Sequence, residues 1–181
     1  AMVTGIDLGD GAFHSHRKKE VGLRLAAAAK AVVYGRRDIA YSGPRFRQAT
    51  QRGGEMVCSF DGLHGGLRSR DGEPLKGFSV AGADRKFVWA DAKLVGTDKV
   101  QVWSDQVPDP VAVRYAWATS PMGNLKVKGL PWQPLHSFRT DSWDWPENED
   151  PADNAMTRMR SREIAQEAAE RCEYRRTQEA A

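Results

Sequence analysis

The chain has few cysteines and no long apolar run. Only two of its 181 residues are cysteine, Cys58 and Cys172. Two cysteines this far apart do not specify a metal site, and their spacing gives no support for a disulfide. No apolar run approaches the roughly 20 residues of a membrane-spanning helix. The sequence therefore predicts neither a metal centre nor a membrane span.

The chain also lacks a concentration of charge of one sign. It has 27 Lys and Arg against 24 Asp and Glu, which gives a net charge of +3. The densest basic run of the first half, Arg17-Lys18-Lys19, is followed at once by Glu20. A nucleic-acid-binding protein needs a basic face with stacking aromatics or a known motif. Neither is present, so we expect no nucleic-acid partner.

What remains is the composition of a soluble globular protein. Hydrophobic residues make up 40% and charged residues 28% of the chain. This length is enough for one sizeable core and for one or two domains.

The first 36 residues predict a strand, a loop and a helix. Residues 3–8 are typical of the end of a short buried strand, and residues 16–34 of a helix. We expect Ser15 to cap this helix and Gly35 to end it. On its polar side, we expect Glu20 and Arg24 to form an i,i+4 ion pair. Its apolar stripe consists of Val21, Leu25, Ala28 and Val32.

From residue 38 onward the apolar period changes to two. Short alternating runs separated by polar turns are typical of an antiparallel β-sandwich or jelly roll. The expected strands cover residues 39–42, 56–60, 76–82, 86–95, 99–104 and 111–117.

The last third of the chain is of a different character. Residues 119–146 are rich in proline and tryptophan and predict an ordered loop. Residues 147–181 predict a polar helical tail with a thin apolar stripe, which is stable mainly when it docks.

His14 is the first candidate for chemistry. A neutral imidazole titrates near working pH, and a histidine on a loop before a helix can act as general base for a serine hydroxyl. It needs a carboxylate that holds its tautomer, and Asp7 and Asp10 are the nearest ones. A plain loop histidine is the simpler interpretation of the spacing alone.

The six tryptophans form a second group of interest. Three of them fall inside alternating strands, which predicts packing in the core or between domains: Trp89, Trp103 and Trp117. The others lie in loops, where an indole can stack on a sugar ring: Trp132, Trp143 and Trp145. We take Trp132 and Trp143 as candidate substrate-binding residues.

A series of short motifs matches one known family in the same order. Ile6-Asp7-Leu8-Gly9 leads to His14 and then to the helix Lys18-Lys19-Glu20-Val21-Gly22-Leu23-Arg24-Leu25. In these motifs the chain resembles the sialate O-acetylesterase family over roughly residues 1–146. The remaining matches are Tyr41–Pro44, Asp71–Phe78, Ala81–Asp84, Phe87–Ala92, Pro110–Trp117, Pro121–Leu125, Gly129–Pro131 and Phe138–Asp141.

The resemblance implies a fold and a division of the chain, which as given is α+β. Residues 1–36 would be the last strand, the catalytic loop and the last helix of an SGNH hydrolase domain, which has a flavodoxin-like α/β fold. Residues 37–146 would be an antiparallel β-sandwich or jelly-roll domain, and residues 147–181 a helical tail.

The resemblance also implies a metal- and cofactor-independent serine esterase. Its substrate would be an O-acetylated carbohydrate, sialic acid or a related sugar, hydrolysed by a Ser-His-Asp mechanism. His14 would be the catalytic histidine and Asp10 its carboxylate, with Asp7 as the alternative. The nucleophilic serine and the oxyanion donors would lie in an upstream catalytic half of the same enzyme, so we expect this chain alone to be inactive.

Two departures from the family support a second hypothesis. Ser15 stands where the family has proline, and Gly11 stands where it has the catalytic aspartate. The alternative is therefore a non-catalytic β-sandwich module that binds carbohydrate or protein and retains a relic of the active-site loop. An extracellular or periplasmic location is implied by the resemblance alone.

Overall fold

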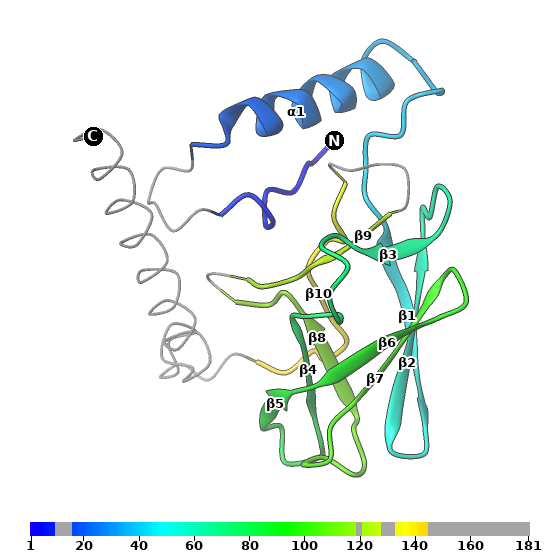
Figure 1. Ribbon diagram of the computed structural model, residues 1–181, viewed down its shortest axis with the longest axis vertical. Coiled ribbons are helices and arrows are strands. Elements are labelled where there is room, and N and C mark those ends of the chain that lie inside the picture. The colour runs from blue at the N-terminus through cyan, green and yellow to red at the C-terminus, as the bar shows by residue number, and fades with distance from the viewer. Residues whose placement is uncertain (10–15, 119–120, 128–132, 145–181) are drawn as a thin grey trace, which may run out of the picture.

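The alternating segments between residues 45 and 139 form short antiparallel strands (Figure 1). The computed structural model describes residues 1–9, 16–118, 121–127 and 133–144. The elements are α1 (Lys18–Val32), β1 (Arg45–Arg52), β2 (Glu55–Asp61), β3 (Leu67–Ser69), β4 (Phe78–Ala81), β5 (Phe87–Trp89), β6 (Asp91–Val95), β7 (Lys99–Trp103), β8 (Ala112–Tyr115), β9 (Leu125–Val127) and β10 (Phe138–Arg139).

Two four-stranded antiparallel sheets pack against one another. One has the order β1-β2-β7-β6, and the other has the order β10-β8-β4-β5. A third, two-stranded sheet pairs β3 with β9. The described part of the chain is thus mostly antiparallel β-structure with one helix, as expected for a β-sandwich.

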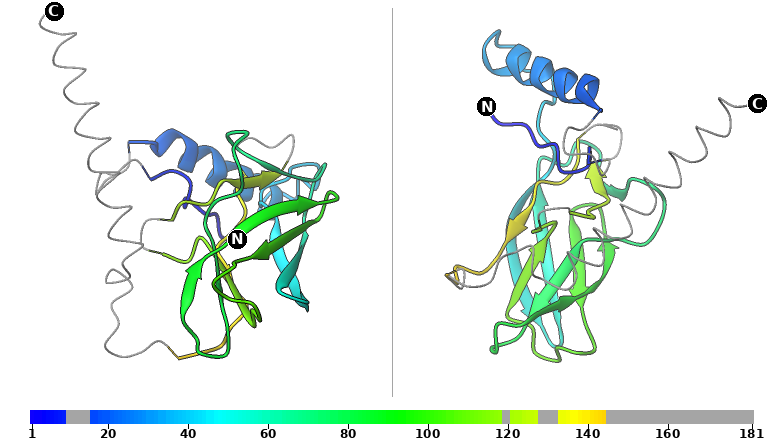
Figure 2. Two further views of the ribbon diagram at one scale, coloured as in Figure 1. Left: turned by 60° about the horizontal axis from the view of Figure 1, so that its bottom comes forward. Right: turned by 90° about the vertical axis from the view of Figure 1, so that its left-hand side faces the viewer.

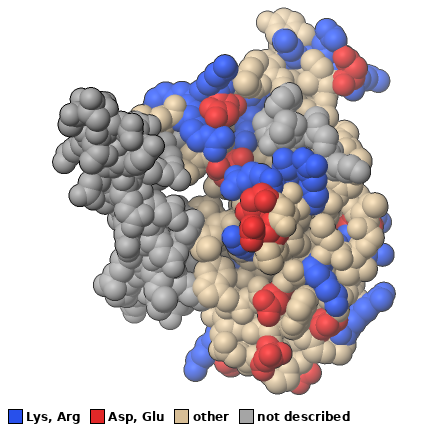
Figure 3. Space-filling model, in the orientation of Figure 1, with Lys and Arg blue, Asp and Glu red and all other residues tan. Residues whose placement is uncertain are grey.

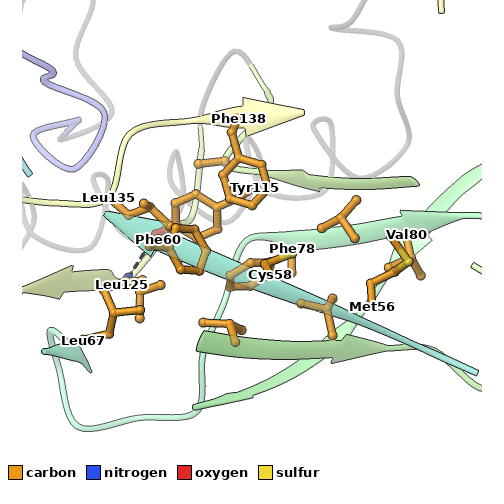
Figure 4. Close-up of a cluster of buried hydrophobic side chains, with 14 of the residues drawn as sticks. Met56, Cys58, Phe60, Leu67, Phe78, Val80, Tyr115, Leu125, Leu135 and Phe138 are labelled. Carbon is orange, nitrogen blue, oxygen red and sulfur yellow. Dashed lines mark hydrogen bonds between the residues drawn. The ribbon is translucent and has the colours of Figure 1, made fainter. Parts of the chain in front are cut away.

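The core lies between the two large sheets (Figure 4). Alternate residues of β2 and β7 point into it from one side, and alternate residues of β4 and β8 from the other, because side chains alternate between the faces of a strand. The buried set includes Met56, Cys58, Phe60, Phe78, Val80, Val100, Val102, Val113, Tyr115 and Phe138. Burial in this core raises the pKa of the Cys58 thiol to about 12, which keeps it protonated.

The strand predictions are confirmed in the middle of the chain and wrong at its edges. The segment expected at 86–95 is two strands, since the chain leaves one sheet after Trp89 and enters the other at Asp91. The strand expected at 39–42 is absent. The longest strand, β1, was not expected, because most of its side chains are exposed and it has no apolar alternation. It pairs along its whole length with β2.

The N-terminal segment and α1 stand at one end of the sandwich. Figures 1 and 2 show residues 1–9 running between α1 and the sheets. The strand expected at 3–8 is wrong: these residues pair with no strand of the described chain, and the Leu8 amide donates to the Gly5 carbonyl in a turn. Leu8 is nevertheless buried.

Helix α1 is shorter than expected but ends as predicted. Gly35 follows its last turn with φ of 67°, and the Arg36 amide donates to the Lys30 carbonyl, an arrangement that a left-handed residue permits. No side-chain hydrogen bond caps its start at Arg17. The expected cap, Ser15, lies outside the described residues.

Tyr115 ties the two-stranded sheet to the core. Its hydroxyl accepts a hydrogen bond from the Leu125 amide at 3.0 Å, drawn as a dashed line in Figure 4. Burial raises the pKa of this phenol. Gly123 leaves room for the ring, because a β-carbon added there would collide with the Tyr115 hydroxyl.

We therefore expect Gly123→Ala to destabilise the protein by about 2–3 kcal/mol, through overpacking and a displaced hydrogen bond. Gly22→Ala is the matched control, since its β-carbon would meet open space on α1. It should be neutral or stabilising by up to about 1 kcal/mol. Urea denaturation of both variants measures this, and equal midpoints would contradict it.

Candidate functional site

The catalytic pair expected from the sequence, His14 and Asp10, lies outside the described residues. The structure does describe what holds the two ends of that loop. Residues 1–9 lead into it, and α1 begins shortly after it. The structure therefore gives the geometry of the frame that flanks this loop, which consists of residues 1–9 and α1.

The centre of this frame is the carboxylate of Asp7. Arg24 of α1 donates to both of its oxygens, each at 2.7 Å, and donates also to the Thr4 carbonyl at 2.6 Å. The side chains are 7% exposed for Asp7 and 2% for Arg24. A buried, bidentate pair of this kind is costly to break from one side, because it leaves an uncompensated charge. It fixes residues 1–9 against α1.

The same aspartate links the frame to the sandwich. Arg70, just after β3, donates to the Asp7 carbonyl at 3.2 Å and lies 3.7 Å from its carboxylate. Arg17 donates to that carbonyl at 3.4 Å. The ion pair expected between Glu20 and Arg24 is wrong, because Glu20 pairs instead with Arg17 at 3.0 Å. The actual partner of Arg24 is Asp7, which a helical spacing rule cannot predict because it lies 17 residues away.

A buried cation lies on the neighbouring two-stranded sheet. Lys126 is 6% exposed and stands directly opposite Arg68 in the register of β3 and β9. Within the described chain it forms no ion pair, and burial, then the nearby Arg68 and Arg70, lower its pKa. Figure 3 shows Lys and Arg side chains gathered below α1 on this side of the molecule.

Two further polar atoms in the described chain are buried without a hydrogen-bond partner. They are the Arg24 Nε and the Gln133 Nε2. Buried donors are normally paired, and each unpaired one carries a desolvation cost.

The structure also brings together a serine and a histidine that sequence reasoning did not connect. The Ser42 Oγ lies 3.4 Å from the His136 Nε2 and donates to the Gly43 carbonyl. Burial, then the charge of Arg45, lower the pKa of His136. No carboxylate of the described chain orients this imidazole, and a long contact without an orienting group is a poor nucleophile–base pair. The 94-residue separation gave no sequence signal for it.

The structure describes one of the two candidate sugar-binding tryptophans. Trp132 lies outside the described residues. Trp143 is half-buried, with its ring 5.8 Å from that of Phe87 and the Arg85 guanidinium 5.5 Å above it. Trp89 and Trp117 do not pack in the core, since they are 45% and 41% exposed, and packing between domains stays a prediction for them. Trp103 is half-buried beneath Lys93.

Metal and membrane features can be stated for the described residues. Among them, no three His, Cys, Asp or Glu side chains gather in a way that could hold a metal ion. None of their helices is long and apolar enough to cross a membrane.

The chain was compared with solved structures, with curated proteins and with protein-family models. The chain is similar to a carbohydrate acetylesterase. That enzyme, from Xanthomonas citri, is 41% identical in sequence and superimposes with a TM-score of 0.67, over 73% of this chain and 30% of its own. This chain therefore spans less than a third of that structure. No family model matches the chain, and no curated protein does either.

We expect Arg24→Met to release α1 from residues 1–9. The Asp7 carboxylate, left with only the more distant Arg70, should cost a few kcal/mol locally, so the amides of α1 should exchange much faster while those of β2 and β7 do not. Hydrogen-exchange mass spectrometry measures this. The double variant Asp7→Leu/Arg24→Met should exchange more slowly than Arg24→Met alone. Arg36→Met, which removes an exposed pair with Asp38, is the control and should change nothing.

Proposed function

We propose that this chain is the C-terminal part of a carbohydrate esterase that removes O-acetyl groups from sialic acid or related sugars. The observation that carries the proposal is the 41% identity to a carbohydrate acetylesterase over 73% of the chain. Residues 1–36 complete an SGNH-type hydrolase domain, residues 37–146 form its β-sandwich domain, and residues 147–181 form a tail.

In the proposed reaction His14 is the general base. It takes the proton of a serine hydroxyl as the serine oxygen attacks the acetyl carbonyl, and it returns the proton to the sugar oxygen that leaves. Water, activated by the same imidazole, then hydrolyses the acetyl-serine and gives acetate. The serine and the oxyanion donors belong to the upstream catalytic half, which is the partner this proposal requires.

Asp10 is the carboxylate we assign to His14. Asp7 was the alternative, but both of its oxygens accept hydrogen bonds from Arg24. A carboxylate held in this way has little freedom to turn toward another donor. Asp7 instead fixes the start of the loop that carries Asp10 and His14, while Gly9 and Gly11 permit a tight loop.

The exposed side of α1 supports an upstream partner domain. Val21, Leu25 and Val32 are 37%, 54% and 50% exposed, although they form the apolar stripe of the helix. Such a stripe normally covers a sheet. Lys126 lies on the sandwich without an ion pair in the described chain, and a partner could supply a carboxylate to it.

The second candidate function is a carbohydrate- or protein-binding module without catalysis. The exposed rings of Trp89 and Trp117 favour carbohydrate, because an exposed indole presents a flat apolar face with a polar edge. This function requires no upstream half.

Acetate release separates the two functions. The purified chain should hydrolyse p-nitrophenyl acetate no faster than its His14→Ala variant, because a histidine without nucleophile and oxyanion donors contributes little. Preceded in frame by its natural upstream coding sequence, it should release acetate from acetylated sugars, and His14→Ala should lower kcat by about 10³-fold or more. Ser42→Ala is the control and should change neither protein.

An extended protein without esterase activity would leave only the binding module. Activity of the chain alone that Ser42→Ala abolishes would place the nucleophile within it.

The exposed stripe gives a second test on the chain itself. We expect the chain to bind a dye for apolar surface or to self-associate in sedimentation experiments. Leu25→Ser/Val32→Ser should weaken both effects. Val111→Ser, which alters an exposed valine of the sandwich, should not. A monomeric chain that binds no dye would argue against a missing partner domain.

A further inference from the structure

The outer face of the sheet β10-β8-β4-β5 carries a row of chemically distinct side chains. The register places Arg139 opposite Arg114, Arg114 opposite Ser79, and Ser79 opposite Trp89. Their neighbours along the strands, such as Phe138, Val113 and Val80, belong to the core. Because side chains alternate, the row lies on the face turned away from the core.

An exposed tryptophan stands at each end of this row. Trp89 is on β5, one edge of the sheet, and Trp117 lies with its ring 5.4 Å from the Arg139 guanidinium on β10, the other edge. Neighbouring strands are about 4.8 Å apart, so the row spans about 14 Å. Two flat apolar surfaces at this separation suit an extended ligand that crosses the strands.

The charges along the row are partly neutralised, because Arg114 and Arg139 share the one carboxylate of Asp141. Asp141 accepts hydrogen bonds from Arg114 at 2.8 and 2.9 Å and lies 3.6 Å from Arg139. Its side chain is buried, and Arg114 and Arg139 lower its pKa. What the face offers to a ligand is therefore aromatic carbon, a hydroxyl and N–H donors, without a strong net charge.

The row is also held rigidly. The Arg114 guanidinium lies 3.9 Å from the centre of the Phe87 ring, and Phe87 contacts Trp143. The Arg139 guanidinium donates to the Trp143 carbonyl at 3.1 Å. Trp143 thus packs the segment 141–144 onto the sheet, and its ring is less available than those of Trp89 and Trp117.

We propose that this face, formed by Trp89, Ser79, Arg114, Arg139 and Trp117, binds a neutral polysaccharide chain that runs across the strands. Sugar rings have apolar C–H faces that stack on indoles and rims of hydroxyls that accept from guanidinium groups. Asp141 offsets one of the two guanidinium charges, so an ionic partner would meet a single net positive charge on this face. The inference rests on the carbohydrate part of the proposed function and not on hydrolysis.

The test is direct binding by the purified chain. Soluble xylan, glucomannan and β-glucan are titrated in calorimetry and against tryptophan fluorescence, with polysialic acid as the charged comparison. We expect binding to at least one neutral polysaccharide, with little dependence on salt. Trp89→Ala and Trp117→Ala should each weaken it about tenfold, whereas Trp89→Phe should retain most of it. Tyr34→Ala, which removes an exposed ring just after α1 and away from this sheet, is the control.

Several outcomes would overturn the proposal. They are no binding to any of the three neutral polysaccharides, binding that the tryptophan variants leave unchanged, and binding to polysialic acid alone that sodium chloride abolishes. Binding by the chain, together with no acetate release by the protein that includes the upstream half, would overturn the esterase and leave this site standing. Acetate release without binding at Trp89 and Trp117 would support the esterase and overturn this binding site.

Discussion

The buried pair of Asp7 and Arg24 is the interaction on which the N-terminal part of this structure depends. Residues 1–9 form no strand ladder within the described chain, and α1 exposes most of its apolar stripe. Hydrophobic burial alone therefore does not hold these two segments together. The bidentate pair does so, and Arg70 extends the contact to the sandwich. The start of the candidate catalytic loop is consequently fixed by charge and hydrogen bonding, in a region where a displacement of about 1 Å would matter for catalysis.

The sequence pattern predicted the sandwich well and its surfaces poorly. Alternation identified β2, β4, β7 and β8, because each has one face in the core. It missed β1, an edge strand of mostly polar residues whose position is determined by pairing with β2. Alternation also cannot distinguish the inner face of a strand from the outer one. Trp89 alternates like a core residue, yet its strand turns Val88 toward the core and the indole outward.

The candidate site was predictable only where its signal is local. His14 and Asp10 are conspicuous because an acidic, glycine-rich turn and a histidine precede a helix. The partner of Arg24 could not be predicted in this way. A helical spacing rule considers residues three or four apart, and Asp7 is 17 residues away. Ser42 and His136 illustrate the same limit at 94 residues. Local rules thus located the loop and missed the contacts that hold it.

The two surfaces of the sandwich proposed for binding are separate, so a partner domain at one end and a glycan on one sheet face could be bound at the same time. At the end near α1, the buried Lys126 carries a desolvation cost that a carboxylate of a docked domain would relieve. On the outer sheet face, Asp141 pairs with both Arg114 and Arg139 and offsets one of their two charges, so that surface is stable without a partner and free to bind weakly and reversibly. The end near α1 has a buried charge without a partner in the described chain, and the outer sheet face does not. We therefore assign a permanent interface to the end near α1 and a transient ligand to the outer sheet face. An enzyme built in this way would hold its polymer by the sandwich while the loop of His14 acts on one acetyl group at a time.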